Sequence, residues 1–475
     1  MDDSTRQSEA PARPADTGGA GSPRRALLTA YSLLVLLPIL LGLGWLLFVA
    51  DGRGAAPTMS AHAESAWDVL SAPLPRFLLQ LLVVLAAAKS AGWLMRRLGQ
   101  PAVIGEMLAG ILLGPSLFGL LLPEAQTWLF PRESLTTLGH VSQLGVLVFM
   151  FAAGAEFDLG QLRGQRRLAL LVSHTGIALP FLLGLILAWG LHPQYAGSGA
   201  GFVSFALFVG VAMSVTAFPV LLRIIEERGY RGRVVATIAV ACAALSDVSA
   251  WTALAGIIAW IQARDPTQLG LNIVLAGGLA WLLLGVVRPR LRDRPVAERD
   301  RPRVMILLIL GALTCALYTE LIGLHLLFGA FLAGVAVSSS PALRRLVEHH
   351  IEPFAVALLL PLFFARTGLD TRIDLLTASE WLLCAAITAL ATLGKLGGTV
   401  LAARVSGMER LDAWRLGALM NTRGLMELIV LALGLQLGLI DQRLYAVLVL
   451  VAIITTVMTG PLLGFIDRRS SRAAD

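Results

Sequence analysis

The chain has 475 residues, of which 56% are hydrophobic and only 15% are charged, and its mean hydropathy is +0.76. About a quarter of the residues in soluble domains are charged, so this composition excludes an ordinary soluble protein and indicates repeated membrane crossing. The three cysteines, Cys242, Cys315 and Cys384, lie in apolar stretches, where we expect them to pack as small hydrophobic residues without disulfides or bound metal.

Apolar stretches long enough to cross a bilayer, which takes about 20 helical residues, follow one another along most of the chain. They cover residues 26–49, 74–95, 102–122, 138–155, 168–191, 201–225, 234–262, 268–287, 304–319, 321–339, 353–369, 379–403, 413–437 and 444–466. The sequence therefore predicts an all-α polytopic membrane protein with about 13–14 transmembrane helices.

The two ends of the chain differ in composition from this region. Residues 1–25 are polar and rich in proline, glycine and charge, which predicts a disordered tail. The first apolar stretch is longer than the roughly 7–15 apolar residues of a signal peptide, so we expect residues 26–50 to form a retained, extra N-terminal helix. Residues 74–466 would form the main transmembrane domain and 467–475 a short tail, with any nucleotide-binding regulatory domain on a separate polypeptide.

Arginines mark every second connection between the predicted helices. The arginine-rich connections hold Arg96 and Arg97; Arg163, Arg166 and Arg167; Arg228, Arg231 and Arg233; seven arginines in 288–303; Arg344 and Arg345; Arg404 and Arg410; and Arg468, Arg469 and Arg472. Cytoplasmic loops of membrane proteins carry such an excess, so the pattern predicts an inner (plasma) membrane protein with both termini in the cytoplasm. The net charge of +7 therefore reflects topology in a lipid bilayer, and no nucleic-acid partner is predicted.

Parts of the sequence repeat. Residues 105–110 read GEMLAG and residues 329–334 read GAFLAG, while 151–154 resemble 363–366. The first two segments lie in the third and tenth predicted helices, which are an odd number apart and so cross the membrane in opposite senses. Inverted repeats of this kind are typical of secondary transporters, although Ala–Gly patterns also arise from close helix packing alone.

Two predicted helices contain breaks at similar depth. Pro219 lies well inside the 201–225 stretch, where proline removes a helical hydrogen bond, and residues 421–424 (Asn-Thr-Arg-Gly) interrupt the 413–437 stretch. Inverted-repeat transporters bind their substrates where paired helices are interrupted. We therefore predict that Pro219 and Gly424 mark two interrupted, crossing helices around a transport site, although Pro219 alone would also suit an ordinary kink.

Asp247 lies near the middle of the 234–262 stretch, where a charge costs at least about 2.5–3.5 kcal/mol. A carboxylate at this depth has either a structural role, with its charge neutralised by a buried partner, or a functional role. Carboxylate oxygens bind a hard cation or a proton, and one group that must choose between them suffices for exchange. We predict that Asp247 binds ion and proton, together with Ser246 and Thr216.

The remaining membrane charges have distinct expected roles. Only two of the 38 basic residues are lysines, Lys89 and Lys395, and a buried lysine can lose its proton whereas arginine cannot. This favours a functional role for Lys395. Arg423 and Glu427 lie four residues apart on one helix face, which predicts an ion pair that holds the second break. Glu106 follows Gly105 directly and is expected to favour a helix N-terminus.

These segments resemble the second family of monovalent cation:proton antiporters, which includes bacterial Na⁺/H⁺ or K⁺/H⁺ exchangers and plant cation/H⁺ exchangers. The similar strings are 105–107 through 114–116, 214–221, 246–248, 394–398 and 421–428. The resemblance spans about residues 74–466 and implies a sodium/proton antiporter-like fold. The resemblance further implies a homodimer, in which a core domain carries the site across the membrane by an elevator-type movement. It also implies that Asp247 is the ion- and proton-binding carboxylate and that Lys395 is its charge partner.

The sequence departs from this family in two places. The helix at 26–49 is extra to the usual thirteen. Members commonly have Asp-Asp or Asn-Asp where this chain has Ser246 followed by Asp247. In the Asp-Asp members the first carboxylate is thought to pair with the lysine, so Lys395 here must pair with Asp247, find another acid or titrate unpaired. A single carboxylate predicts electroneutral, one-for-one exchange.

Two alternative functions fit the same pattern. A proton-driven exporter of a small organic solute would need a wider, aromatic-lined cavity near Asp247, for which Trp251 and Phe218 are available. A transport-inactive membrane sensor would follow if loss of the first carboxylate had removed ion coupling. The sequence contains no phosphate-binding glycine loop, nucleophile elbow or zinc motif, so neither enzyme activity nor a cofactor is predicted.

Overall fold

The computed structural model describes residues 66–156, 166–230, 233–262, 266–292 and 295–472. The predicted tail at 1–25 and the predicted helix at 26–50 lie outside these residues. Contacts divide the chain at Leu78, and all the candidate site residues belong to the compact unit that begins at Leu79.

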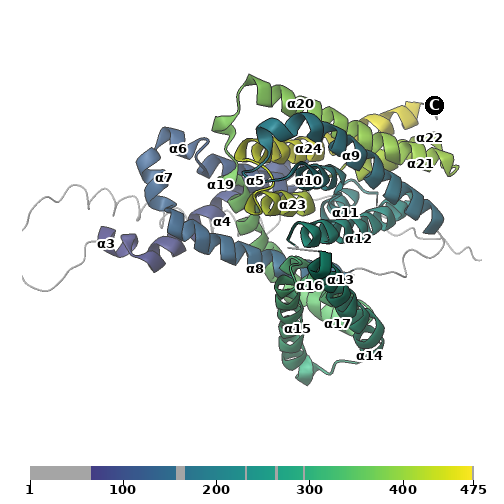
Figure 1. Cartoon of the computed structure of the whole chain (residues 1–475), viewed down its shortest axis with the longest axis horizontal. Coiled ribbons are helices and arrows are strands. Elements are labelled where there is room, and N and C mark those ends of the chain that lie inside the picture. Colours follow the sequence, from purple (N-terminus) through teal and green to yellow (C-terminus); the bar gives the residue numbers. More distant parts are fainter. Residues whose placement is uncertain (1–65, 157–165, 231–232, 263–265, 293–294, 473–475) are drawn as a thin grey trace, which may run out of the picture. The chain divides into compact units, whose positions relative to one another are not determined.

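Helices account for most of the described residues in the first half of the chain (Figure 1). They are α3 (Ala66–Ser71), α4 (Pro73–Arg97), α5 (Ala102–Leu113), α6 (Phe118–Leu121), α7 (Pro123–Leu129), α8 (Arg132–Glu156), α9 (Arg166–Tyr195), α10 (Phe202–Ser214), α11 (Phe218–Glu227) and α12 (Val234–Gln262).

The second half is equally helical. Its elements are α13 (Pro266–Trp281), η3 (Leu282–Val287), α14 (Arg288–Leu291), η4 (Glu298–Asp300), α15 (Arg301–Leu321), α16 (Leu326–Val337), α17 (Pro341–Leu346), η5 (Val347–Ile351), α18 (Glu352–Phe354), η6 (Ala355–Leu359), α19 (Leu360–Asp370), η7 (Ile373–Leu375), α20 (Ala378–Thr392), η8 (Leu393–Gly397), α21 (Gly398–Val405), α22 (Arg410–Met420), α23 (Leu425–Gln436) and α24 (Gln442–Arg472). The segments η3, η5, η6 and η8 are π-helical turns inside longer helices.

The prediction of an all-α polytopic membrane protein is confirmed. Among the described residues, ten helices are long and apolar enough to cross a membrane, and three shorter apolar helices accompany them. The two shortest predicted spans, 304–319 and 353–369, belong to longer helical stretches, Glu298–Leu321 and Pro341–Leu375. The predicted span 321–339 begins later than expected, at Leu326, because the chain first turns at Gly323, whose φ is +72°.

Close glycine contacts reveal the inverted repeat. A methyl group at Gly110 of α5 would lie 2.1 Å from the carbonyl oxygen of Ala365 in α19. The counterpart of Gly110 in the repeated string is Gly334 of α16, and a methyl group there would lie 2.1 Å from the carbonyl oxygen of Phe151 in α8. Thus α5 packs on α19 as α16 packs on α8.

The reciprocal side of each contact repeats in the same way. Gly368 of α19 closely approaches Met107 of α5, and Gly154 of α8 closely approaches Phe331 of α16. Each contact therefore joins one helix from each half of the sequence, and the two halves have exchanged roles between one contact and the other. This exchange is the contact pattern of two repeats related by a pseudo-twofold axis, as in secondary transporters with inverted repeats.

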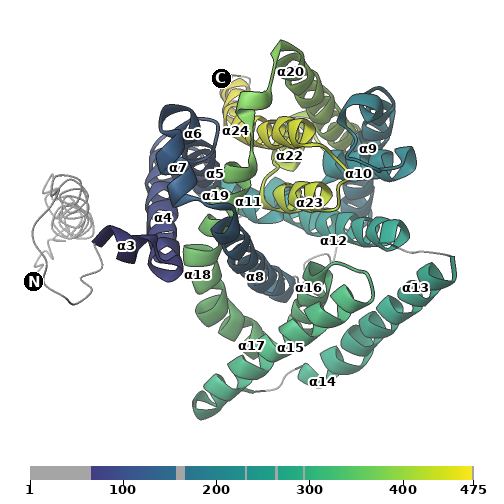
Figure 2. The same ribbon diagram turned by 60° about the vertical axis from the view of Figure 1, so that its left-hand side comes forward.

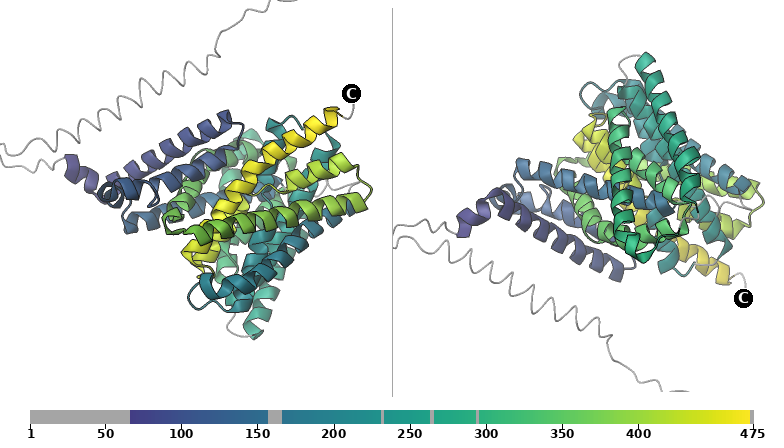
Figure 3. Two further views of the ribbon diagram at one scale, coloured as in Figure 1. Left: turned by 90° about the horizontal axis from the view of Figure 1, so that it is seen from above. Right: turned by 90° about the horizontal axis from the view of Figure 1, so that it is seen from below.

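Two groups of helices can be distinguished in Figure 2. One contains α9 to α12 with α20 to α24, in which α10 packs against α9, and α22 packs against both α12 and α24. The other contains the paired helices α5 with α19 and α8 with α16. Figure 3 shows that the long helix α24 runs beside α20. We call the first group the core helices, and they hold both interrupted helices.

Candidate functional site

Both predicted helix breaks are present. Helix α10 ends at Ser214, the backbone at Val215 is extended, and α11 begins at Phe218. Pro219 is therefore the second residue of α11, a position where the missing proline N–H leaves no helical bond unmade. The second break separates α22 from α23 at residues 421–424. Gly424 adopts a φ of +153°, which side chains other than glycine rarely tolerate.

The two breaks contact each other directly. The backbone N–H of Ala217, in the first break, donates to the carbonyl oxygen of Thr422, in the second, at 3.2 Å. The second break is also tied to α24, because the hydroxyl of Thr456 donates to the carbonyl oxygen of Arg423 at 2.7 Å. The interrupted helices therefore cross at their non-helical segments, where backbone groups are free of helical bonds.

Arg423 and Lys395 share one partner, the C-terminal end of half-helix α10. Arg423 donates to the carbonyl oxygens of Ala212 at 3.1 Å and Met213 at 2.6 Å, and Lys395 donates to that of Ser214. The last carbonyls of a helix lack helical partners and carry its negative partial charge, so two cations stabilise this end. The sequence reasoning missed this role because the bonds join residues about 180–210 positions apart.

Arg423 also forms the ion pair expected from the sequence. Its Nη1 lies 2.5 Å from Oε1 of Glu427, and both side chains are fully buried. A buried guanidinium without a carboxylate would be very costly, so Glu427 neutralises the charge that holds α10. The pair thereby couples the start of α23 to the end of α10.

Asp247 lies on α12 against the start of half-helix α11. Its side chain is buried, and its carboxylate accepts a hydrogen bond from the backbone N–H of Phe218. Its Oδ1 atom has no hydrogen-bond partner among the residues that the structure describes. The N-terminus of α11 directs its positive partial charge at this carboxylate. Lys395 interacts electrostatically with Asp247, yet among the described residues no ion pair within 4.0 Å joins them, because the lysine bonds to Ser214 instead.

Further polar atoms near the breaks are buried and unpaired. Thr216 Oγ1, in the first break, has no partner within the described part of the chain, and neither does the amide of Asn421, in the second. Ser246 differs, since its hydroxyl lies 2.9 Å from that of Ser173 on α9, and both are fully buried. The structure thus brings Thr216, Asp247 and Lys395 to the crossing. The hydroxyl of Ser246 has its hydrogen-bond partner in Ser173, a residue that no sequence motif had indicated.

The expectation for Glu106 was wrong. Helix α5 begins at Ala102, so Glu106 lies inside the helix and not at its N-terminus. Gly105 lies within α5 and allows it to pack against Ala91, since a methyl group there would lie 2.3 Å from the Ala91 carbonyl oxygen. Glu106 is buried and forms an ion pair with Lys89 of α4 at 3.6 Å, so Lys89, unlike Lys395, has an acidic partner within ion-pair distance among the described residues.

Inverted repeats, two interrupted helices that cross, and buried charges at the crossing together define a multi-pass membrane protein built like a secondary transporter. The chain matches the family described as "Sodium/hydrogen exchanger, transmembrane" over residues 83–467. It therefore belongs to this family of transporters.

Individual relatives agree with this assignment. The Na⁺/H⁺ antiporter NhaS4 of Synechocystis is 37% identical over 392 residues, which cover 81% of this chain and 95% of the relative. Cation/H⁺ antiporter 18 of Arabidopsis thaliana is 34% identical over 84% of this chain. The chain spans only about half (50%) of that plant protein.

The fold is also similar to a solved structure. The sodium proton antiporter MjNhaP1 from Methanocaldococcus jannaschii matches with a TM-score of 0.60 at 14% identity, covering 83% of this chain and 98% of that one. At this identity the likeness concerns the fold alone.

Proposed function

We propose that this protein exchanges protons for a monovalent cation, Na⁺ or K⁺, and that Asp247 carries either ion in turn. The observation that carries the proposal is the buried carboxylate of Asp247, with one oxygen unpaired, beside the crossing of two interrupted helices. The unpaired hydroxyl of Thr216 supplies another oxygen of the kind that such cations prefer. Family membership and the name of the relative NhaS4 agree with this substrate class.

The proposed exchange follows from competition at one carboxylate. A proton on Asp247 removes the charge that attracts the cation, and a bound cation makes protonation unfavourable. The two ions are therefore carried in opposite directions if the site is exposed to each side in turn. The core helices α9 to α12 and α20 to α24 would move as one body past the paired helices α5, α8, α16 and α19, in an elevator-type step.

Lys395 has a separate role in this proposal. It holds the end of α10 and acts electrostatically on Asp247, so loss of its proton would change both the hold on α10 and the charge beside Asp247.

Replacing Lys395 with arginine keeps a positive charge that cannot be released. We expect Lys395→Arg to slow exchange by about tenfold, equivalent to about 1.4 kcal/mol, with loss of its pH dependence on the alkaline side. Exchange rates across a pH series check this, and Lys89→Arg, at a half-exposed lysine, should behave as the parent protein. A parental pH profile in Lys395→Arg would refute a titrating lysine.

Ser246 suggests the stoichiometry. Its hydroxyl is paired with Ser173, so the neighbour of Asp247 is a neutral group. With one carboxylate, and with no proton carried across on Lys395, each cycle would move one cation in one direction and one proton in the other, and exchange would be electroneutral. In proteoliposomes we expect the same rate with and without an imposed membrane potential set by valinomycin, with Na⁺ as the transported cation. A rate that rises or falls with the potential would disprove electroneutrality.

The proposal extends to location and assembly. The arginine-rich loops support an inner-membrane protein with both termini in the cytoplasm. Helix α15 exposes Leu307, Leu310 and Leu317, which suits contact with lipid or with a second copy, and the family resemblance supports a homodimer. The purified protein in lipid nanodiscs would show its mass directly by light scattering.

A further inference from the structure

Two adjoining cavities lie at the arginine-rich ends of helices α13 to α17, away from the helix crossing. The larger has a volume of about 520 Å³ and is lined by apolar side chains of η3, α15, α16 and α17, among them Leu283, Val287, Leu308, Ala336 and Leu343. Its size falls within the range of small-molecule binding sites. Its apolar lining suits a hydrocarbon chain.

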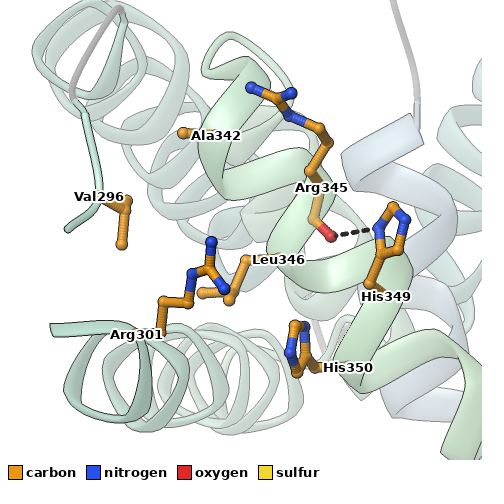
Figure 4. Close-up of a pocket in the computed structure, with 7 residues that line it drawn as sticks. All are labelled: Val296, Arg301, Ala342, Arg345, Leu346, His349 and His350. Carbon is orange, nitrogen blue, oxygen red and sulfur yellow. Dashed lines mark hydrogen bonds between the residues drawn. The ribbon is translucent and has the colours of Figure 1, made fainter. Parts of the chain in front are cut away.

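The smaller cavity, of about 370 Å³, has a different chemistry. Its lining includes Arg301 of α15, Arg345 of α17, and His349 and His350 of η5, which Figure 4 labels. Val296 lines both cavities, so the basic cavity adjoins the apolar one. An occupant of both would need an anionic group attached to an apolar chain.

The basic side chains are available to such an anion. Arg301 pairs with Glu298 at 3.2 Å, but this pair is exposed and therefore weak, so a phosphate could replace the carboxylate. Arg345 uses its Nε to bind the carbonyl oxygen of Pro341, and the Nδ1 of His349 lies 2.8 Å from the carbonyl oxygen of Arg345. Asp300 lines the apolar cavity and opposes the anion, but it is partly exposed and lies 3.7 Å from Arg299.

We infer that these two cavities form a binding site for one anionic phospholipid, whose phosphate lies among Arg301, Arg345, His349 and His350 and whose acyl chain enters the apolar cavity. Both cavities lie where membrane-spanning helices end, which is the depth of lipid headgroups. Anionic lipids are attracted to basic clusters at the cytoplasmic face, by about 1 kcal/mol for each arginine or lysine.

The test measures lipid binding to the purified full-length chain. Phosphatidylglycerol, phosphatidylcholine and inorganic phosphate are added separately to the protein in detergent. Native mass spectrometry counts the bound lipid molecules, and the temperature of thermal unfolding measures the stabilisation. The double variant R301Q/R345Q removes two charges from the cavity. The matched control R290Q/R299Q removes two charges from the same region outside it, where both arginines are exposed.

We expect the parent protein and the control to bind and be stabilised by phosphatidylglycerol but not by phosphatidylcholine. R301Q/R345Q should bind it about 30-fold more weakly, which corresponds to about 2 kcal/mol. Equal weakening in both variants would overturn the inference in favour of diffuse attraction, and stabilisation by phosphate alone would overturn it in favour of a free-anion site. If R301Q/R345Q does not fold, the parent protein still tests the inference, because equal binding of phosphatidylglycerol and phosphatidylcholine would overturn it. Dissociation of a dimer by R301Q/R345Q without a change in lipid binding would instead place a second copy on this surface.

Discussion

Replacing Asp247 with asparagine should abolish coupled exchange and leave the fold intact. The amide keeps the size of the side chain and an oxygen that can accept the N–H of Phe218. It cannot carry a negative charge, so neither the cation nor the proton binds as before. The expected loss of rate is about 100-fold or more, equivalent to about 2.7 kcal/mol, which is within the range for interactions with charged groups.

Asp300→Asn is the matched control, because it makes the same chemical change at a partly exposed carboxylate far along the chain from the crossing. Exchange in Asp300→Asn vesicles should equal that of the parent. The Asp247→Asn protein should elute and unfold as the parent does, which separates a transport defect from misfolding. Coupled exchange by Asp247→Asn at a tenth of the parental rate or more would contradict the role given to this carboxylate.

Replacing Arg423 with methionine should be the most destabilising of these changes. It leaves Glu427 buried without its partner and frees the carbonyl oxygens of Ala212 and Met213. Breaking a buried ion pair by removing one partner costs about 3–5 kcal/mol. Thermal unfolding in detergent should show this loss, whereas Arg372→Met, which breaks an exposed pair with Asp374, should cost less than about 1 kcal/mol.

A double variant distinguishes the two roles of Arg423. In Arg423→Met/Glu427→Leu the unpaired carboxylate is gone, and replacing a buried pair by apolar side chains is often neutral. The carbonyl oxygens at the end of α10 remain without a donor, so stability should recover only in part. Full recovery would mean that the ion pair alone matters and that Arg423 does not hold α10.

The membrane architecture could be predicted because its causes are local in the sequence. Each span is an apolar run, and one break lies just before Pro219 whereas the other is the polar segment 421–424 that ends in Gly424. The repeat was visible in the spacing of Gly105 and Gly110 against Gly329 and Gly334, since close helix approach requires glycine at those positions.

The partners of the site residues could not be predicted, because they depend on which helices become neighbours. The position of Lys395 in the sequence does not reveal that it bonds to the carbonyl oxygen of Ser214, because every partner considered for it from the sequence was an acid. Ser173 is one serine among many in apolar runs, and only the packing of α9 on α12 identifies it. Glu106 was misjudged as a residue of the helix N-terminus, although it lies four residues beyond Ala102, where α5 begins.

The central claim is that the protein exchanges protons for a monovalent cation, and dissipation of a pH gradient in vesicles tests it most directly. Proteoliposomes with an acidic interior and a trapped fluorescent pH indicator receive NaCl, KCl or choline chloride in turn. We predict that Na⁺, K⁺ or both collapse the gradient at once, that choline does not, and that Asp247→Asn vesicles respond to none of them. A gradient that survives every inorganic cation, or that collapses equally in the Asp247→Asn vesicles, would contradict the account.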